Sequence, residues 1–308
     1  MNEKETLNLK NDNRLDLSEA EDNFLKIEKK YHEEGFTFDD PKFLQDCYER
    51  AVKILNIDTI DMDEFKHLYN VEKDKETIQR IEEKIKAKNI KEEEINVKIA
   101  TIWEAILHEL IEQACYLGDN ITTKRTCKYD DLVNSIDDIL EIESEGQHRT
   151  ADHLAVVIDA TFSQNIDKKI ARIEKEINNG ELGKLKYFES DFLEFKGEKT
   201  GIPKFILGID RQNLESVTAL WYENRGNLLA KHPLQIIILE EIIKQAQYFR
   251  DYAEKVKQPA VVEKYEKLYQ IFVQIKKDRE DELAEISSNE DNKTIINRDG
   301  VYGAIRNL

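Results

Sequence analysis

The stretch Asp138-Ile139-Leu140-Glu141-Ile142-Glu143, followed by His153-Leu154-Ala155-Val156-Val157-Ile158-Asp159-Ala160-Thr161, decides the fold that we expect for this chain. Its first run alternates between apolar and acidic residues, and its second run is continuously apolar from Leu154 to Ile158. Alternation is typical of a strand with one covered face, and a continuous apolar run is typical of a central strand. We therefore predict strands over 139–143 and 154–161, with the second more central.

The sequence on both sides of these strands predicts further elements of one α/β domain. Apolar residues from Ile99 to Ala114 recur with helical spacing, and Gly118 is a C-cap candidate. A strand followed by a helix and another strand predicts a parallel pair. The predicted elements are a buried helix over 97–117, an amphipathic helix over 163–179, a possible hairpin of 184–188 with 192–195, a buried strand over 204–209 and a helix over 212–222.

The remainder of the chain is predicted to be helical, with polar ends. The fold class is therefore α/β (α+β), with a mixed central sheet flanked by helices, a helical N-terminal region and long C-terminal helices. The first twenty residues and those after Ser287 contain few large apolar groups, so we expect them to contribute little to the core. The predicted divisions are a mobile tail at 1–20, a helical region at 21–96, the α/β domain at 97–260, a C-terminal helix at 261–286 and a polar tail at 287–308.

Composition limits the classes of function. The chain has 308 residues, of which 36% are charged, and its net charge is −18. This acidity argues against broad coating of nucleic acid or membrane, so any nucleic-acid site must be a local basic patch. The three cysteines form no C-x-x-C pair, and no apolar stretch is long enough to span a membrane. We therefore expect a soluble protein of the reducing cytoplasm.

Acidic residues beside the two predicted strands are the main functional signal. Asp137 and Asp138 precede the first strand, and Asp159 stands near the end of the second. Carboxylates at strand ends often cap turns by accepting backbone hydrogen bonds. Convergent carboxylates can instead hold a divalent cation such as Mg²⁺ or Mn²⁺. Spacing alone leaves both interpretations open.

The two acidic strands and their order resemble the PD-(D/E)XK nuclease superfamily, over roughly residues 100–222. That resemblance implies an αβββαβ, restriction-endonuclease-like core and metal-dependent hydrolysis of phosphodiester bonds in DNA or RNA. It also implies that Asp138 and Asp159 are catalytic metal ligands. An acid on the preceding helix often contributes a further ligand in this superfamily. The candidates for additional ligands are Glu104 or Glu112 on the helix, with Asp131 and Asp130 further along the chain.

One position departs from the superfamily pattern. The resemblance implies a lysine two residues after the second acid, where this chain has Thr161. Some members supply the lysine from the following helix, where Lys168 and Lys169 are the catalytic candidates here. Lys168, Arg172 and Lys175 also fall on one helical face, which predicts a local nucleic-acid-binding stripe. Because acidic residues share this helix, the stripe could equally be an ion-paired surface.

Three hypotheses follow from the sequence. The first is a Mg²⁺- or Mn²⁺-dependent nuclease-like enzyme, and the second is a non-catalytic member of the same fold that serves binding or assembly. The third is an acidic helical scaffold protein, suggested by the charged helices at both ends. The chain has no phosphate-binding G-x-x-x-x-G-K-[ST] loop, no G-x-G-x-x-G and no G-x-S-x-G, so nucleotide kinase, dinucleotide-binding and serine hydrolase functions lack their local chemistry.

Overall fold

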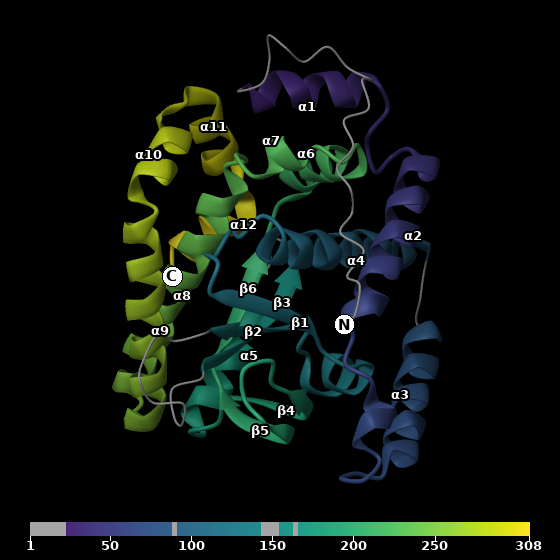
Figure 1. The fold of residues 1–308 in the computed structure, drawn as a ribbon, viewed down its shortest axis with the longest axis vertical. Helices are drawn as coiled ribbons and strands as arrows, with labels where there is room; N and C mark the ends of the chain where they lie inside the picture. Colours follow the sequence, from purple (N-terminus) through teal and green to yellow (C-terminus); the bar gives the residue numbers. More distant parts are fainter. Residues whose placement is uncertain (1–22, 88–90, 143–153, 163–165) are drawn as a thin grey trace.

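A four-stranded mixed sheet lies at the centre of the molecule (Figure 1). The computed structural model describes residues 23–87, 91–142, 154–162 and 166–308. The strand order in the sheet is β1-β2-β3-β6, and β4 and β5 form a separate hairpin. The strands are β1 (Ile121–Arg125), β2 (Asp138–Ile142), β3 (Leu154–Thr161), β4 (Gly183–Glu189), β5 (Lys196–Ile202) and β6 (Lys204–Gly208).

The helices before the sheet form the predicted helical N-terminal region and the first helix of the α/β domain. Helix α2 begins at Pro41, where the Asp40 side chain accepts hydrogen bonds from the backbone N–H groups of Lys42 and Phe43. The elements here are α1 (Phe24–Glu33), α2 (Pro41–Asp58), the short 3₁₀ helix η1 (Met62–Phe65), α3 (Val71–Lys86) and α4 (Lys91–Glu112). The predicted mobile tail at 1–20 lies outside the described residues.

Among the later helices, α8 packs along β6, and α9 lies beside α8 (Figure 1). Periodicity predicts four helices here, over 163–179, 212–222, 232–255 and 261–286. The structure divides the last into α9 and α10, and η2, α7, α11 and α12 were not predicted. The elements are the π-helical turn η2 (Asp130–Asn134), α5 (Asp167–Asn178), α6 (Arg211–Tyr222), α7 (Gly226–Leu229), α8 (Leu234–Lys255), α9 (Pro259–Asp278), α10 (Glu280–Ser288), α11 (Glu290–Arg298) and α12 (Gly300–Arg306).

The three predicted strands share one sheet, which confirms the mixed α/β architecture. Strand β2 pairs antiparallel with β3, with Asp138 opposite Ile158, and β3 pairs parallel with β6, with Thr161 opposite Gly208. The predicted end of the first strand, Glu143, lies outside the described residues. Strand β1 was not predicted, because its sequence Ile-Thr-Thr-Lys-Arg has a single large aliphatic residue. Pairing with β2 and burial beneath α4 make it a strand.

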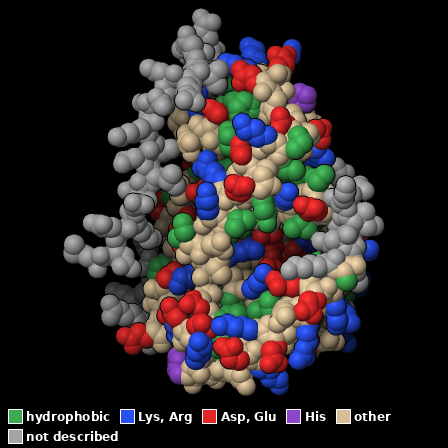
Figure 2. Space-filling view, turned by 90° about the vertical axis from the view of Figure 1, so that its right-hand side faces the viewer, with side chains coloured by type: hydrophobic (Ala, Val, Ile, Leu, Met, Phe, Trp, Pro, Cys, Tyr) green, Lys and Arg blue, Asp and Glu red, His purple; other side chains and the backbone are tan. Residues whose placement is uncertain are grey.

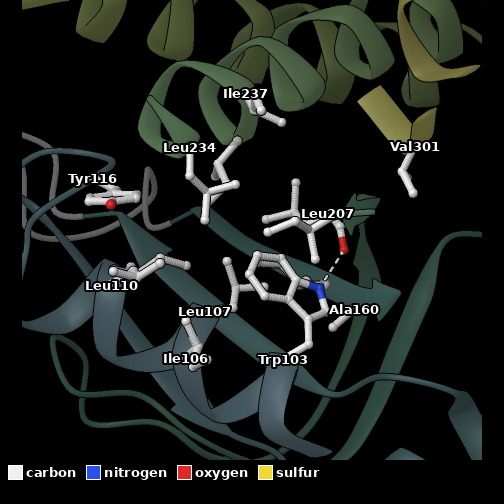
Figure 3. Close-up of a cluster of buried hydrophobic side chains, with 14 of the residues drawn as sticks. Trp103, Ile106, Leu107, Leu110, Tyr116, Ala160, Leu207, Leu234, Ile237 and Val301 are labelled. Atoms are coloured by element: carbon white, nitrogen blue, oxygen red, sulfur yellow. Dashed lines mark hydrogen bonds between the residues drawn. The ribbon is translucent and has the colours of Figure 1, made fainter. Parts of the chain in front are cut away.

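Helix α4 packs on one face of the sheet, as predicted. Figure 3 shows Trp103 of this helix against the sheet, where its indole Nε1 donates a hydrogen bond to the Leu207 carbonyl at 3.2 Å. Leu140 and Ile142 of β2 belong to the same apolar cluster as α4. The alternate residue Ile139 belongs to a second cluster with Leu185 and others from the β4–β5 hairpin. The two faces of the sheet are therefore covered by different elements.

Side chains of α8 cover the outer edge of β6. Gln245 accepts a hydrogen bond from the Ile206 N–H at 2.9 Å and donates one to the Ile206 carbonyl at 2.7 Å. Glu241 accepts from the Gly208 N–H at 2.9 Å. A sheet edge buried by a helix must have its backbone groups paired. Gln245 and Glu241 therefore supply hydrogen-bond partners to the backbone groups of Ile206 and Gly208 on the outer edge of β6.

The C-terminal residues differ from the predicted polar tail. Residues 290–298 and 300–306 are helices α11 and α12, and Ile295, Val301 and Ile305 are buried in the main core. Gly208 makes room for this packing, because a Cβ at that position would lie 2.1 Å from Val301 Cγ1. The expectation that residues after Ser287 contribute little to the core is therefore wrong. Their few apolar residues are spaced so that most of them face the core.

Helix α4 also ends earlier than predicted, at Glu112 rather than near Gly118. Cys115 takes a positive φ of 50°, which turns the chain out of the helix before Tyr116 and Leu117 enter the core. Within the described part of the chain, none of the helices combines the length and apolar character needed to cross a bilayer.

Candidate functional site

Asp137 and Asp159 meet where β2 begins and β3 ends. The Asp137 N–H donates to the Ile158 carbonyl at 2.9 Å, and Asp137 Oδ2 accepts from the Ala160 N–H at 2.8 Å. These two bonds fix the Asp137 carboxylate beside the end of β3. Because Asp137 bonds the N–H group of Ala160, its carboxylate lies next to the chain position of Asp159. The two acids therefore share one site.

Asp138, assigned by the resemblance as the first metal ligand, has different neighbours. Its side chain is only 2% exposed and makes ion-pair contacts with His108 of α4 and Arg125 of β1. Adjacent residues of a strand point to opposite faces. Asp138 therefore points with Leu140 and Ile142 toward α4. The sequence analysis named Asp137 as one of two acids before this strand, but it selected Asp138 as the metal ligand.

Lys169 and Arg172 reach the site from α5. Lys169 Nζ donates to Asp159 Oδ1 at 2.5 Å and to the Ala160 carbonyl at 3.2 Å, and Arg172 Nη2 donates to Asp159 Oδ2 at 2.5 Å. The structure thus brings the predicted helix lysine to the second acid. The other two basic candidates, Lys168 and Lys175, are exposed on the same helix. Only Arg172 of the predicted stripe contacts the acidic site.

Glu104 and Asp131 both lie against Arg125, a residue that the sequence analysis did not select. Arg125 Nη2 lies 2.6 Å from Glu104 Oε2 and 3.8 Å from Asp131 Oδ2. Its Nη1 lies 3.6 Å from Asp138 Oδ2. The guanidinium group is therefore surrounded by carboxylates from α4, η2 and β2. Because β1 was not recognised as a strand, no sequence signal placed this arginine near the acids.

The two remaining acidic candidates have structural partners elsewhere. Glu112 accepts a hydrogen bond from the backbone N–H of Thr123 on β1. Asp130 is fully buried and accepts from the backbone N–H groups of Lys186 at 2.9 Å and Tyr187 at 3.0 Å. These bonds tie α4 to β1 and η2 to β4. For these two acids, hydrogen bonding to the backbone accounts for the position of the carboxylate.

The carboxylates of the site are difficult to ionise together. Burial raises the pKa of Glu104 to about 7, with Arg125 opposing the rise and Asp131 and Asp138 adding to it. Burial also raises the pKa of Asp137 well above its usual value, and the charges of Glu104 and Asp159 raise it further. Burial, with smaller effects from Asp138 and Asp159, raises the pKa of Asp131. Excess negative charge of this kind favours the binding of a cation.

The donor set suits a hard divalent cation by its chemistry. Glu104, Asp137 and Asp159 offer only carboxylate oxygens, the ligands that Mg²⁺ and Mn²⁺ prefer. In the residues that the structure describes, no three His, Cys, Asp or Glu side chains already stand at metal-binding spacing. Both oxygens of Asp159 are bonded to Lys169 and Arg172. A cation at this site would therefore compete with the ammonium and guanidinium groups for Asp159.

Acidic and basic side chains are interspersed over the face shown in Figure 2, and several of them meet around a hollow.

No protein family model, curated protein or solved structure matches this chain.

Proposed function

We propose that this chain is a metal-dependent phosphodiesterase that acts on nucleic acid, with a restriction-endonuclease-like core. The observation that supports it most is that Asp137 and Lys169 both bond the end of β3 beside Asp159. The order of α4, β1, β2, β3, α5 and β6 agrees with the αβββαβ core that the resemblance implies. In this proposal Asp137 replaces Asp138 as the first acid.

The carboxylates of Asp137, Asp159 and Glu104 would hold the cation. When bound, Mg²⁺ or Mn²⁺ would supply a Lewis acid at the phosphate and lower the pKa of a bound water. Lys169 takes the place of the lysine that is missing at Thr161. Its ammonium group, held against Asp159 and the Ala160 carbonyl, is placed to stabilise negative charge that develops on the phosphate.

The remaining basic residues of α5 have a separate role in this proposal. Arg172 offsets the charge of Asp159, and the exposed Lys168 and Lys175 are free to approach the backbone of the nucleic acid. Phosphate contacts of this kind give affinity without sequence preference. An acidic protein can bind a polyanion only through such a local patch.

One observation favours a second candidate, a non-catalytic member of the same fold. Both oxygens of Asp159 are already neutralised by Lys169 and Arg172, and Thr161 stands at the usual lysine position. Because Lys169 and Arg172 already balance the charge of Asp159, this site does not need a metal ion for its stability. In that case the fold would serve binding or assembly.

Thermal unfolding with and without metal distinguishes the two candidates. At a metal concentration of about 100 times Kd, binding to the native state alone adds about 2.7 kcal/mol. We therefore expect Mg²⁺ or Mn²⁺ to raise the melting temperature of the wild-type protein by about 5 °C, and chelator to reverse the rise. Asp159→Asn should abolish the rise, whereas Asp167→Asn, at an exposed acid of α5, should retain it.

Cleavage assays complete the test. The wild-type protein with Mg²⁺ or Mn²⁺ is incubated with supercoiled, linear and single-stranded DNA and with RNA, and Asp137→Asn and Asp159→Asn are compared with Asp138→Asn. We expect the first two variants to lose cleavage. A wild-type protein that gains no stability from either metal and cuts none of these substrates would refute the enzyme and favour the non-catalytic candidate.

A further inference from the structure

A groove is formed by α8, α9 and α10 and shares no residue with the candidate site. Its volume is about 520 Å³, which is within the range of about 300–1,000 Å³ that is typical of small-molecule sites. Because apolar surface is more stable out of water, a ligand with an apolar body gains free energy by covering the wall. The apolar side chains of the wall are Ile236 and Leu239 of α8, Val273 of α9, and Leu283 and Ala284 of α10.

Arg279 ties the junction of α9 and α10 to the rest of the fold. It follows the last residue of α9, Asp278, and precedes the first residue of α10, Glu280. Its guanidinium group donates hydrogen bonds to the Tyr116 carbonyl and to the side chain of Gln235 on α8. These bonds hold α10 in place relative to α8. The walls of the groove are therefore positioned before a ligand binds, which reduces the entropy that binding must lose.

Four charged side chains also line the groove: Glu240, Lys276, Lys277 and Glu280. The first two are paired with each other, because Lys276 Nζ donates to Glu240 Oε1 at 2.7 Å. The hydroxyl group of Tyr302 donates to the other oxygen of Glu240. Lys277 and Glu280 are exposed, and in the part of the chain that the structure describes their side chains form no ion pair. The groove therefore offers one unpaired positive charge and one unpaired negative charge beside an apolar wall.

We propose that this groove binds a single-chain amphiphile with a zwitterionic head. The alkyl chain lies against the apolar wall, the anionic group of the head pairs with Lys277, and its cationic group pairs with Glu280. These two residues are three positions apart in the chain. A head with a single charge meets a like charge as well as an opposite one, so it gains less from this pair than a zwitterion does.

The occupant is one molecule rather than the surface of a bilayer. Leu239 is fully buried, and Ile236 and Leu283 are 8% and 6% exposed. The unpaired charges, in contrast, are on exposed side chains. A bilayer presents its heads and keeps its chains inside, so it cannot place a chain against this wall.

Binding of decylphosphocholine to the full chain tests the proposal. The ligand is added below its critical micelle concentration, and the methyl resonances of Ile236, Leu239 and Leu283 are followed by NMR. We expect them to shift with a Kd below about 1 mM. Decyl sulfate and decyltrimethylammonium have the same chain with one charge each, and we expect both to bind about 2- to 5-fold more weakly. Phosphatidylcholine vesicles should not sediment the protein.

Two alanine variants test the location. Ala284→Trp places a large side chain in the groove and should weaken binding of decylphosphocholine at least about 10-fold. Ala260→Trp makes the same change on α9, outside the lining residues, and should bind like wild type. Both alanines are exposed on helices, and circular dichroism and urea unfolding check the fold of each variant.

Two charge variants test the head group. Lys277→Gln should weaken binding of decylphosphocholine and decyl sulfate about 2- to 5-fold and leave that of decyltrimethylammonium unchanged. Glu280→Gln should weaken binding of decylphosphocholine and decyltrimethylammonium and leave that of decyl sulfate unchanged. Lys244→Gln, at an exposed lysine of α8 outside the groove, is the control and should alter none of the three.

Three results would overturn the proposal. The first is wild-type protein whose groove methyl groups do not shift, or shift equally in Ala284→Trp. The second is equal affinity for the three heads that neither charge variant changes, because the groove would then recognise only the chain. The third is sedimentation with vesicles without binding of the single molecule, which would favour a membrane surface. Cleavage of nucleic acid is measured separately, so these results leave the proposed function untouched.

Discussion

Lys169 on α5 bonds Asp159 at the end of β3, with 2.5 Å between Nζ and Oδ1. This contact joins a helix residue to a strand residue across ten positions of the chain. It places an ammonium group beside Asp159, although the strand itself has Thr161 at the position where the resemblance implies a lysine. The next residue back, Lys168, is exposed and makes no such contact. The two adjacent lysines therefore form a matched pair for experiment.

Lys169→Met should reduce metal-dependent cleavage about 100-fold, the usual effect of removing one group that stabilises developing charge. It should keep or enlarge the metal-dependent rise in melting temperature, because Lys169 is not a ligand and would no longer compete with the cation for Asp159. Lys168→Met should change cleavage little. Single-turnover rates on the best substrate, together with thermal unfolding, provide the measurement. Equal losses for both variants would contradict the assignment of Lys169.

His108→Gln should remove a pH-dependent contribution to stability. Burial lowers the pKa of His108, but the neighbouring carboxylates of Asp138 and Asp58 outweigh it and raise the pKa from 6.5 to about 9. A raised pKa stabilises the fold fully below pH 6.5, and this stabilisation is lost as the pH rises through about 9. The difference in unfolding free energy between wild type and variant should therefore shrink from pH 6.5 to 9.

Urea unfolding of metal-free protein at a series of pH values measures that difference. His67→Gln, at an exposed histidine before α3, serves as the control for the same change of side chain outside the core. A difference for His108→Gln that stays constant across this range would show that the imidazole does not gain its proton more readily in the folded state.

Gly208→Ala should destabilise the protein. A Cβ at this position would lie 2.1 Å from Val301 Cγ1 and 3.2 Å from Thr161 Cγ2. Overpacking of a buried site costs about 1–3 kcal/mol. Gly303→Ala on α12, where a Cβ would meet nothing within 4 Å, should instead be neutral or stabilise by up to about 1 kcal/mol. Equilibrium unfolding in urea compares the two, and equal stabilities would argue against the packing of α12 on β6.

Gln245→Leu should destabilise the outer edge of the sheet. The change leaves the N–H and carbonyl groups of Ile206 without the partners that Gln245 supplies. A buried polar group that loses its partner costs about 1–3 kcal/mol. Gln270→Leu, at an exposed residue of α9, should have a small effect. Urea unfolding measures both changes, and hydrogen exchange at Ile206 should quicken in Gln245→Leu alone.

The local pattern of the sequence determined the elements whose apolar residues are dense and regular. Helix α4 and strands β2, β3 and β6 follow from period and length, because those patterns fit one regular structure each. Local order also determined that Asp159 lies at a strand end. It also placed Lys169 near the start of the helix that follows, and in the structure this residue lies in the first turn of α5, close enough to bond that strand end.

Only the tertiary structure decided which acids and bases share the site. Asp137 and Asp138 are adjacent, and their neighbours depend on how β2 lies against β3 and α4, a pairing that local sequence does not specify. Arg125 enters the site because a polar segment becomes β1 by pairing with β2. Residues 290–306 become part of the core for a similar reason. Their helices are short, and most short helices are stable only when their apolar side is buried against the rest of the fold.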